Sequence, residues 1–267
     1  MTIQTTVAAP PRQRSLSLRD RDRILSIASP IGLLLLWELA ADGGLIDTRF
    51  FPAPSSILSL LIEMLQSGEL LTHTAASLQR LFWGILIGGV PALVLGIVMG
   101  LNRTIRALID PIIAATYPIP KSSILPLALL IFGLGESSKI FMVAIGVFFP
   151  VAINATTGVL EINKIYLDVG RNYKADRWSM FWTIALPGAL PVIMTGFKLG
   201  IGIGLILIAI AEMIGAKSGL GFLIWSAWET FAVEQMYVGL FMIALIGFAL
   251  TLALNELERF IIPWKVN

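Results

Sequence analysis

Few side chains in this sequence have the types and spacing that catalytic chemistry requires. The chain has no cysteine and a single histidine, His73. This removes disulfides, thiol catalysis, most zinc sites and any serine–histidine pair that does not use His73. The acidic residues are scattered, so no paired carboxylates are placed to hold a catalytic metal. We therefore expect a chain that is not an enzyme and binds neither a metal nor a cofactor.

Polar side chains inside long apolar segments point instead to contact with a solute. Lys121, followed by Ser122 and Ser123, interrupts one such segment, and an ionisable group at membrane depth is costly without a partner. These residues could contact an anion. Alternatively, the Lys121 side chain could extend along the apolar segment and place its ammonium group at the membrane interface, which explains its position as well. Polar residues on other spans can equally bond helix to helix. The candidates for a translocation path are Lys121, Ser122, Ser123, Asn154, Thr157 and Glu212.

The stretch GAKSGLG, residues 215–221, resembles a phosphate-binding loop in composition only. Such a loop needs the pattern Gly-x-x-x-x-Gly-Lys-Ser/Thr, and Ala216 stands where its second glycine must be. We expect no ATP binding here. The stretch is predicted to be a turn, either beside the mouth of a pore or simply rich in glycine.

Membrane-spanning helices must position these residues. Of the 267 residues, 57% are hydrophobic and 13% are charged, about half the charged share of a soluble domain. The apolar runs predict an all-α membrane protein whose transmembrane domain covers residues 24–260, between a tail at 1–23 and a C-terminus at 261–267. Residues 102–110 are predicted to be a polar loop. The six predicted spans are 24–42, 81–101, 111–135, 140–160, 186–211 and 237–256.

Small residues recur at every fourth position on two of these spans. Each series forms a flat stripe that allows another helix to approach closely, within the subunit or across a dimer. The two series are Gly84, Gly88, Ala92, Gly96 and Gly100, and Gly196, Gly200 and Gly204.

Lysine and arginine are distributed unevenly between the two sides. With the N-terminus inside, the tail, the 102–110 loop, the 161–183 loop and the C-terminal end from Arg259 hold 13 basic residues, against 4 on the other side. Cytoplasmic loops carry the excess of basic residues. Both termini and the loop 161–185 are therefore expected in the cytoplasm, and the formal charge of +2 is too small to suggest nucleic-acid binding.

The loop sequence DVGRNYKADRWSMFWTIALPGALP, residues 168–191, is charged and aromatic between apolar runs. Helical spacing predicts two short amphipathic helices, the second ending near Leu186, where Pro187 and Pro191 begin the fifth span. A projecting helical hairpin would fit the groove of a partner, although an interfacial loop with an aromatic belt also explains the pattern. The predicted faces are Asp168, Arg171, Asn172 and Ala175 on the first helix and Trp178, Phe181, Trp182 and Ala185 on the second.

This stretch resembles the coupling segment of permease subunits of ATP-binding-cassette (ABC) importers. The family pattern is Glu-Ala-Ala, three residues, Gly, and later Ile-x-Leu-Pro. Further segments resemble the nitrate, sulfonate, taurine and bicarbonate branch: FFPAPSSIL, PIPKSSILPLALLIFGLGESSK, FFPVAINATTGV and AEMIGAKSGLGFLIWSA. The matching positions are Asp168, Val169 and Gly170 for Glu-Ala-Ala, Lys174 for Gly, and Ile184, Leu186 and Pro187 for the end.

The resemblance implies a type I ABC importer permease fold with a cytoplasmic coupling-helix loop in a bacterial inner membrane. Its implied partners are membrane lipid, a second permease copy, two cytoplasmic ATPase subunits that bind ATP and Mg²⁺, and a periplasmic or lipid-anchored solute-binding protein. The implied solute is a small oxyanion or sulfonate such as nitrate, taurine, an alkanesulfonate or bicarbonate. The implied ATPase-coupling residues are Asp168, Val169, Gly170, Arg171, Tyr173, Lys174, Ala175, Arg177 and Trp178.

Lys174 departs from the family pattern, because glycine is the residue that most readily allows a left-handed turn. Either the turn uses another geometry, or Lys174 contacts the partner.

Two other classes of function compete with the permease. An ATP-independent secondary transporter usually shows repeated halves and intramembrane acids, and a membrane-embedded transferase needs a catalytic constellation.

Overall fold

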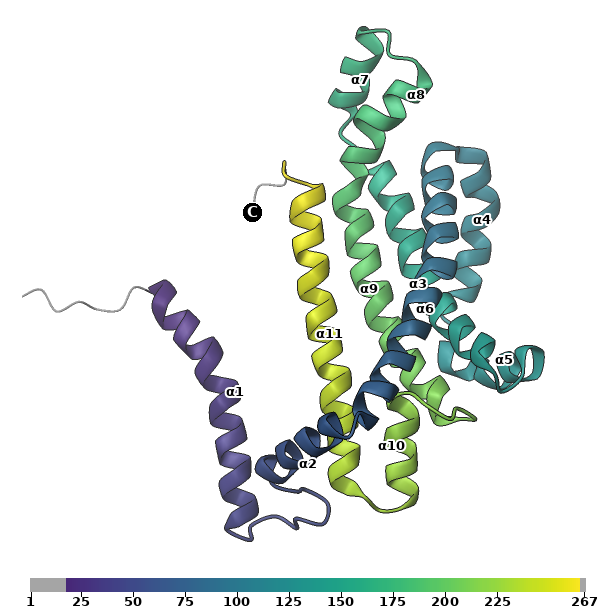
Figure 1. The fold of residues 1–267 in the computed structure, drawn as a ribbon. Helices are drawn as coiled ribbons and strands as arrows, with labels where there is room; N and C mark the ends of the chain where they lie inside the picture. Colours follow the sequence, from purple (N-terminus) through teal and green to yellow (C-terminus); the bar gives the residue numbers. More distant parts are fainter. Residues whose placement is uncertain (1–17, 265–267) are drawn as a thin grey trace, which may run out of the picture. The chain divides into compact units, whose positions relative to one another are not determined.

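The computed structural model describes residues 18–264, which form helices and no strands (Figure 1). The chain divides after Ser56 into two compact units. In the first unit, α1 (Leu18–Asp42) contains the predicted span 24–42. Its Glu38 accepts hydrogen bonds from the Ser55 backbone N–H and hydroxyl, at 3.0 and 2.6 Å. Most of the predicted tail, residues 1–17, and residues 265–267 lie outside the described part.

The second unit is built around three packed helices. Helix α6 packs against both α3 and α9, and α11 lies beside α9 (Figure 1). The helices after α1 are α2 (Pro54–Gln66), α3 (Glu69–Leu101), α4 (Arg103–Thr116), α5 (Leu125–Phe132), α6 (Glu136–Leu160), α7 (Lys164–Asn172), α8 (Arg177–Met180), α9 (Leu186–Met213), α10 (Leu220–Glu229) and α11 (Val233–Ile261).

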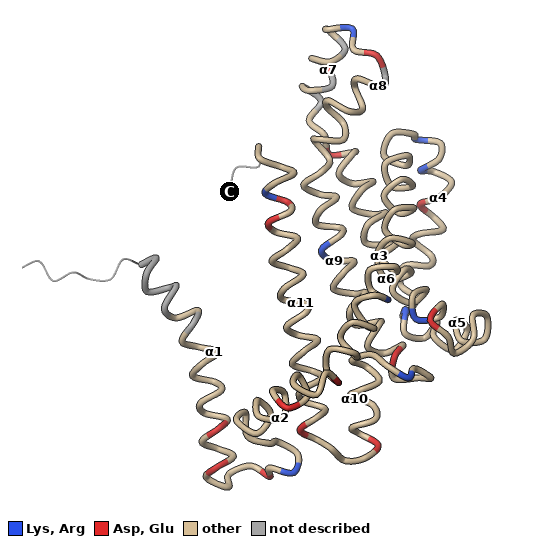
Figure 2. The backbone as a smooth tube through the Cα atoms, in the orientation of Figure 1, with Lys and Arg blue, Asp and Glu red and all other residues tan. Residues whose placement is uncertain are grey.

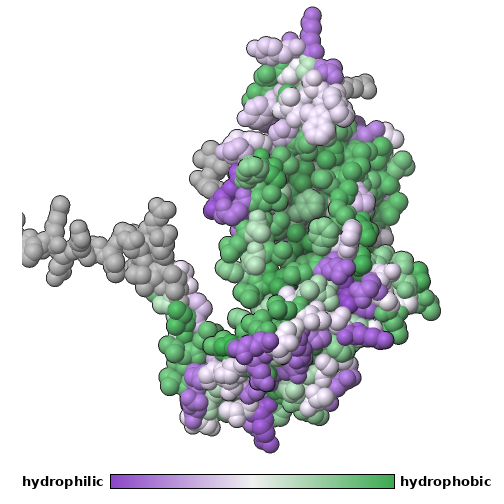
Figure 3. All heavy atoms as spheres, in the orientation of Figure 1, coloured by the Kyte–Doolittle hydropathy of each residue, from purple (hydrophilic) through white to green (hydrophobic). Residues whose placement is uncertain are grey.

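Four described helical segments are long and apolar enough to cross a membrane: α3, α6, residues 178–213 and α11. A fifth is possible if α4 and residues 121–132, which meet at 89°, form one broken span. Charged residues are sparse along the middle of these helices, and the visible surface there is apolar (Figures 2 and 3). The protein is therefore an all-helical membrane protein with four or five candidate spans among its described residues. The helices are longer than predicted, since α3 begins at Glu69 rather than 81 and α11 at Val233 rather than 237.

The predicted polar loop at 102–110 is wrong, because helix α4 begins at Arg103. The side chain of Asn102 accepts hydrogen bonds from the backbone N–H groups of Thr104 and Ile105, at 2.9 and 3.2 Å. Asparagine is a favoured N-cap, since its side chain pairs N–H groups that lack a partner in the first turn. The third predicted span, 111–135, is likewise divided by the bend between α4 and α5.

The glycine stripes pack helices together within the subunit. The sequence predicted this arrangement or packing across a dimer. A Cβ atom on Gly88 of α3 would lie 2.2 Å from the carbonyl oxygen of Ala144 on α6. A Cβ atom on Gly196 of α9 would lie 2.9 Å from the carbonyl oxygen of Pro150. These approaches bring α3, α6 and α9 into backbone contact, which only glycine permits.

Candidate functional site

A helical hairpin of α7 and α8 projects from the end of α9 (Figure 1). Its second arm does not end near Leu186 as predicted. A π-helical turn, Phe181–Ala185, joins α8 to α9, and the backbone N–H of Leu186 bonds to the carbonyl of Phe181. This extra residue in the turn accommodates Pro187, which has no N–H to donate. The hairpin and the spanning helix therefore form one continuous helical element.

The hairpin turns at Lys174 with the backbone conformation that glycine usually supplies. Lys174 has φ 55°, and the N–H of Ala175 bonds to the carbonyl of Gly170 at 3.0 Å. This six-residue closure is a Schellman motif, in which the left-handed residue follows the helix end. The alternative that the turn uses another geometry is thus wrong. A lysine in this conformation is strained by about 1–2 kcal/mol.

Close packing and capping fix the two arms of the hairpin. Gly170 is buried, and a Cβ atom there would lie 2.7 Å from the Ile184 side chain and 2.8 Å from that of Met180. Asp176 caps α8 by accepting from the N–H of Trp178 at 3.2 Å. Hydrogen bonding to Ser179 holds the pKa of the Asp176 carboxyl below its ordinary value.

The end of the hairpin exposes apolar and aromatic side chains. Tyr173 is 85% exposed and Trp178 is 68% exposed, and Val169 is also exposed. Asp168 is exposed on α7, but Ala175 does not share its helical face as predicted, because α7 ends at Asn172. The side chains of Arg171 and Arg177 lie outside the described part of the structure.

Lys121 lies in the bend between α4 and α5 and is bonded to backbone. Its Nζ donates to the carbonyl oxygens of Thr116, Tyr117 and Ile119, at 3.2, 2.8 and 2.9 Å. It also lies 4.3 Å from the ring centre of Phe149 on α6, a cation–π distance. The lysine thus bonds carbonyls in the last turn of α4 and just beyond it, where a helix leaves carbonyls without partners of its own.

The other predicted path residues have different surroundings. Ser122 and Ser123 are exposed, whereas Asn154 and Thr157 are half-buried on α6. The side-chain amide of Asn154 donates to the carbonyl of Pro150 at 2.8 Å, one turn back in its own helix. The structure therefore brings Lys121 next to α6, but it does not collect all six predicted residues at one place.

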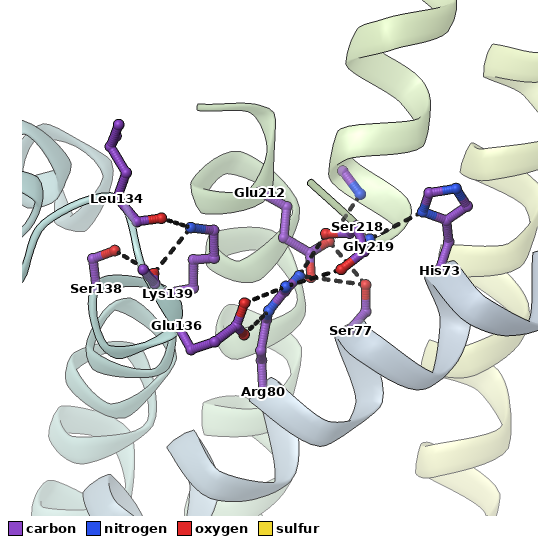
Figure 4. Close-up of polar contacts among 12 residues, drawn as sticks. His73, Ser77, Arg80, Leu134, Glu136, Ser138, Lys139, Glu212, Ser218 and Gly219 are labelled. Atoms are coloured by element: carbon purple, nitrogen blue, oxygen red, sulfur yellow. Dashed lines mark hydrogen bonds and ion pairs between the residues drawn. The ribbon is translucent and has the colours of Figure 1, made fainter. Parts of the chain in front are cut away.

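Glu212, the sixth of them, belongs to a buried charge network that the sequence did not reveal. Arg80 of α3 donates from Nη1 to Glu212 at 2.8 Å and makes two bonds to Glu136, from Nε at 2.5 Å and from Nη2 at 2.7 Å (Figure 4). It also bonds to the carbonyl and hydroxyl oxygens of Ser218. Arg80 and Glu212 are only 3% and 0% exposed. We call Arg80, Glu136, Glu212 and Ser218 the Arg80 network. It joins α3, α6, α9 and the 214–219 turn.

The glycine-rich turn closes on the same network. Its successive N–H groups at Gly219, Leu220 and Gly221 donate to His73 Nδ1, Ser77 Oγ and Glu212 Oε2, at 3.1, 2.8 and 2.9 Å. Figure 4 shows the first of these bonds, from Gly219 to His73. These side chains pair the N–H groups at the start of α10, where a negative charge is favourable. His73, the single histidine of the chain, is half-buried here.

Comparison with known proteins shows where such a chain belongs. The family model described as "Binding-protein-dependent transport system inner membrane component" matches residues 92–265. The taurine transport system permease protein TauC of Escherichia coli K12 is 36% identical, over 92% of this chain and 91% of TauC. The nitrate import permease protein NrtB of Synechocystis is 28% identical, over 98% of each chain.

A solved structure shares the fold. A chain of the inward-facing MetNI methionine ABC transporter aligns with a TM-score of 0.52 and 21% identity, over 70% of this chain and 91% of that one. A putative aliphatic sulfonates permease, SsuC of Escherichia coli K12, is 35% identical over 88% of this chain and 90% of its own. The chain therefore belongs to the family of binding-protein-dependent transport system inner membrane components, and it is a non-catalytic, multi-pass permease subunit of an ABC importer.

Proposed function

We propose that this permease carries a small oxyanion or sulfonate, such as nitrate, taurine, an alkanesulfonate or bicarbonate, across the inner membrane. The relatives support this class, since their names specify taurine, aliphatic sulfonates and nitrate. Six spans of the type I arrangement would place both termini in the cytoplasm, with α1 as the first span and the bent α4–α5 pair as the third. We propose that this chain itself binds no cofactor.

Two copies of the permease would pair in the membrane, with two cytoplasmic ATPase subunits on one side and a solute-binding protein on the other. The coupling loop, residues 161–185, would seat in the ATPase, and ATP and Mg²⁺ would bind there. The observation that carries this role is the continuity of α8, the π-helical turn and α9. A displacement of the hairpin would therefore move a spanning helix as a rigid body.

The hairpin would bind the ATPase through its exposed end. Val169, Tyr173 and Trp178 supply apolar surface, and aromatic side chains often dominate the binding energy of an interface. Asp168, Arg171, Lys174 and Arg177 would add charged contacts around them. Gly170 and Ala175 would act by closing the turn on which these side chains stand.

Replacing Tyr173 by glutamate should weaken assembly with the ATPase by about tenfold or more, the loss typical of an aromatic interface anchor. Because Tyr173 is 85% exposed, the permease itself should fold normally. Co-purification of the two subunits measures assembly, and ATP-driven uptake in vesicles should fall with it. Tyr173→Phe keeps the ring and should assemble normally. Unchanged assembly and uptake for Tyr173→Glu would rule out the docking role.

The solute path is proposed to pass the bend between α4 and α5. Lys121 would supply positive charge there, with the hydroxyls of Ser122 and Ser123 beside it and Asn154 and Thr157 on α6. The Lys121 ammonium already donates its hydrogen bonds to three backbone carbonyls. A passing anion would therefore be attracted by its positive charge and would not receive a hydrogen bond from it. We leave Glu212 out of the path, since it is fully buried against Arg80.

Uptake measurements would test the solute class. The permease, reconstituted with its ATPase and binding protein, should accumulate labelled taurine, an alkanesulfonate, nitrate or bicarbonate only when ATP is supplied inside. Excess unlabelled anion of the same class should compete. Accumulation driven by an ion gradient without ATP would favour a secondary transporter and contradict the proposal.

A further inference from the structure

The turn between α10 and α11 holds a phenylalanine where this type of turn favours glycine. The N–H of Ala232 bonds to the carbonyl of Ala227 at 2.8 Å, and Phe231 between them has φ 57°. The turn is a Schellman motif like the one at Lys174. A positive φ is a genuine outlier for a bulky residue, so the backbone at Phe231 is held in a disfavoured conformation.

The ring of Phe231 is also 84% exposed, and two tryptophans of α10 are exposed near the same end. The ring centres of Trp225 and Trp228 lie 4.7 Å apart. The indole Nε1 of Trp225 donates to the carboxylate of Glu229 at 3.0 Å, so its polar edge is already bonded. We call Trp225, Trp228 and Phe231 the aromatic cap.

The position of the aromatic cap follows from the length of α11. Between Glu234 and Glu256 no residue is charged, and this helical stretch is about 32 Å long at about 1.5 Å per residue. That length matches the roughly 30 Å hydrocarbon core of a bilayer. The turn at Phe231, just before Glu234, therefore lies at the level of the lipid headgroups.

The residues next to the aromatic cap in the sequence carry no positive charge for an anionic lipid headgroup. Residues 218–258 contain no lysine or arginine, and Glu229 and Glu234 are the acids next to the turn. Nothing there attracts an anionic headgroup, so attachment must come from burial of the rings. Tryptophan and other aromatic rings favour the boundary between headgroups and acyl chains.

We infer that the aromatic cap inserts into the headgroup boundary of the membrane and anchors the α10–α11 hairpin at that end of α11. The strained backbone at Phe231 is then the means of pointing a ring into lipid. This inference needs only that α11 crosses the membrane. It does not depend on which solute is carried or on how the α7–α8 hairpin binds.

Nitroxide labels on single cysteines would test the anchor, because the chain has no cysteine of its own. Phe231→Cys and Trp228→Cys would be labelled in the full-length permease, reconstituted in phosphatidylcholine bilayers. Tyr173→Cys is the matched control, since its side chain is exposed to the same degree, 85% against 84%, at the end of another helical hairpin. Collision with oxygen, which concentrates in lipid, is compared with collision with a water-soluble nickel chelate.

The label at 231 should collide more with oxygen than with the nickel chelate, the label at 228 should do the same, and the label at 173 should show the reverse. The ratios should not change in high salt, because no ion pair is involved. Preferential collision with nickel at 231 would overturn the inference. So would a label at 231 that stays in water until a solute-binding protein immobilises it, since the cap would then be a protein-docking surface.

Discussion

Replacing Arg80 by leucine should lower the free energy of unfolding by about 3–5 kcal/mol, the usual cost of removing one partner from a buried ion pair. Glu212 is 0% exposed and would lose its cationic partner. The side-chain oxygens and the carbonyl that accept from the five N–H groups of Arg80 would lose their donors as well. Titration from mild detergent into a denaturing one, followed by circular dichroism, measures the change.

A second substitution separates the charge from the shape of the site. In Arg80→Leu/Glu212→Gln, the glutamine can still accept from the N–H of Gly221, but no buried carboxylate remains. This double variant should recover a substantial part of the lost stability, because the main cost of the single change is the unpaired charge. Equal instability of the single and double variants would show that hydrogen bonding, rather than charge, dominates the Arg80 network.

An exposed pair provides the control. Arg49 bonds to Asp47 at 2.8 Å, but its side chain is 83% exposed. Surface ion pairs of this kind contribute about 0–1 kcal/mol. Arg49→Leu should therefore shift the unfolding midpoint far less than Arg80→Leu. Comparable shifts would mean that burial does not set the cost at Arg80.

Four of the six predicted spans are confirmed as helices long and apolar enough to cross a membrane, because composition alone marks them. The predicted runs within α3, α6, α9 and α11 each have at least the roughly 20 residues that a helix needs to cross a bilayer. Helix ends were harder to place. The charges at 103 and 106 suggested a loop, although Asn102 is a good N-cap and the apolar residues Ile105, Leu108 and Ile112 follow at helical spacing.

The Arg80 network was missed because its members lie far apart in the sequence. Arg80 and Glu212 are 132 positions apart, and no local pattern joins them. One signal was available, since both stand at the ends of predicted spans on the same side of the membrane. An ionisable group at the end of a span favours a partner of opposite charge, and the Arg80 guanidinium and the Glu212 carboxylate could supply this for one another.

The turn at Lys174 shows a different limit of sequence reasoning. A family pattern identified the position, but it could not say whether a lysine keeps the left-handed geometry. The backbone bond from Ala175 to Gly170 closes the motif without a side chain. A residue other than glycine can therefore occupy the position at a modest cost in strain.

Gly88→Ala should be among the most damaging single-methyl changes in the chain, costing about 2–3 kcal/mol as overpacking against backbone. The new Cβ would lie 2.2 Å from the carbonyl oxygen of Ala144 and 2.7 Å from its Cα. No rotamer change can relieve contact with backbone, so α3 and α6 must move apart. The loss is measured in the same detergent titration, and uptake should fall as the helices separate.

A graded series within α9 makes this prediction specific. A Cβ on Gly204 would meet side-chain atoms at 3.3–3.4 Å, which can shift slightly, whereas Gly202 has no atom within 4 Å. Gly204→Ala should therefore have a small effect. Gly202→Ala should be neutral or stabilising by up to about 1 kcal/mol, since alanine is the better helix former. If Gly88→Ala were as stable as Gly202→Ala, the helices would not approach as closely as the glycine stripe requires, and the rigid α3–α6–α9 core would need another explanation.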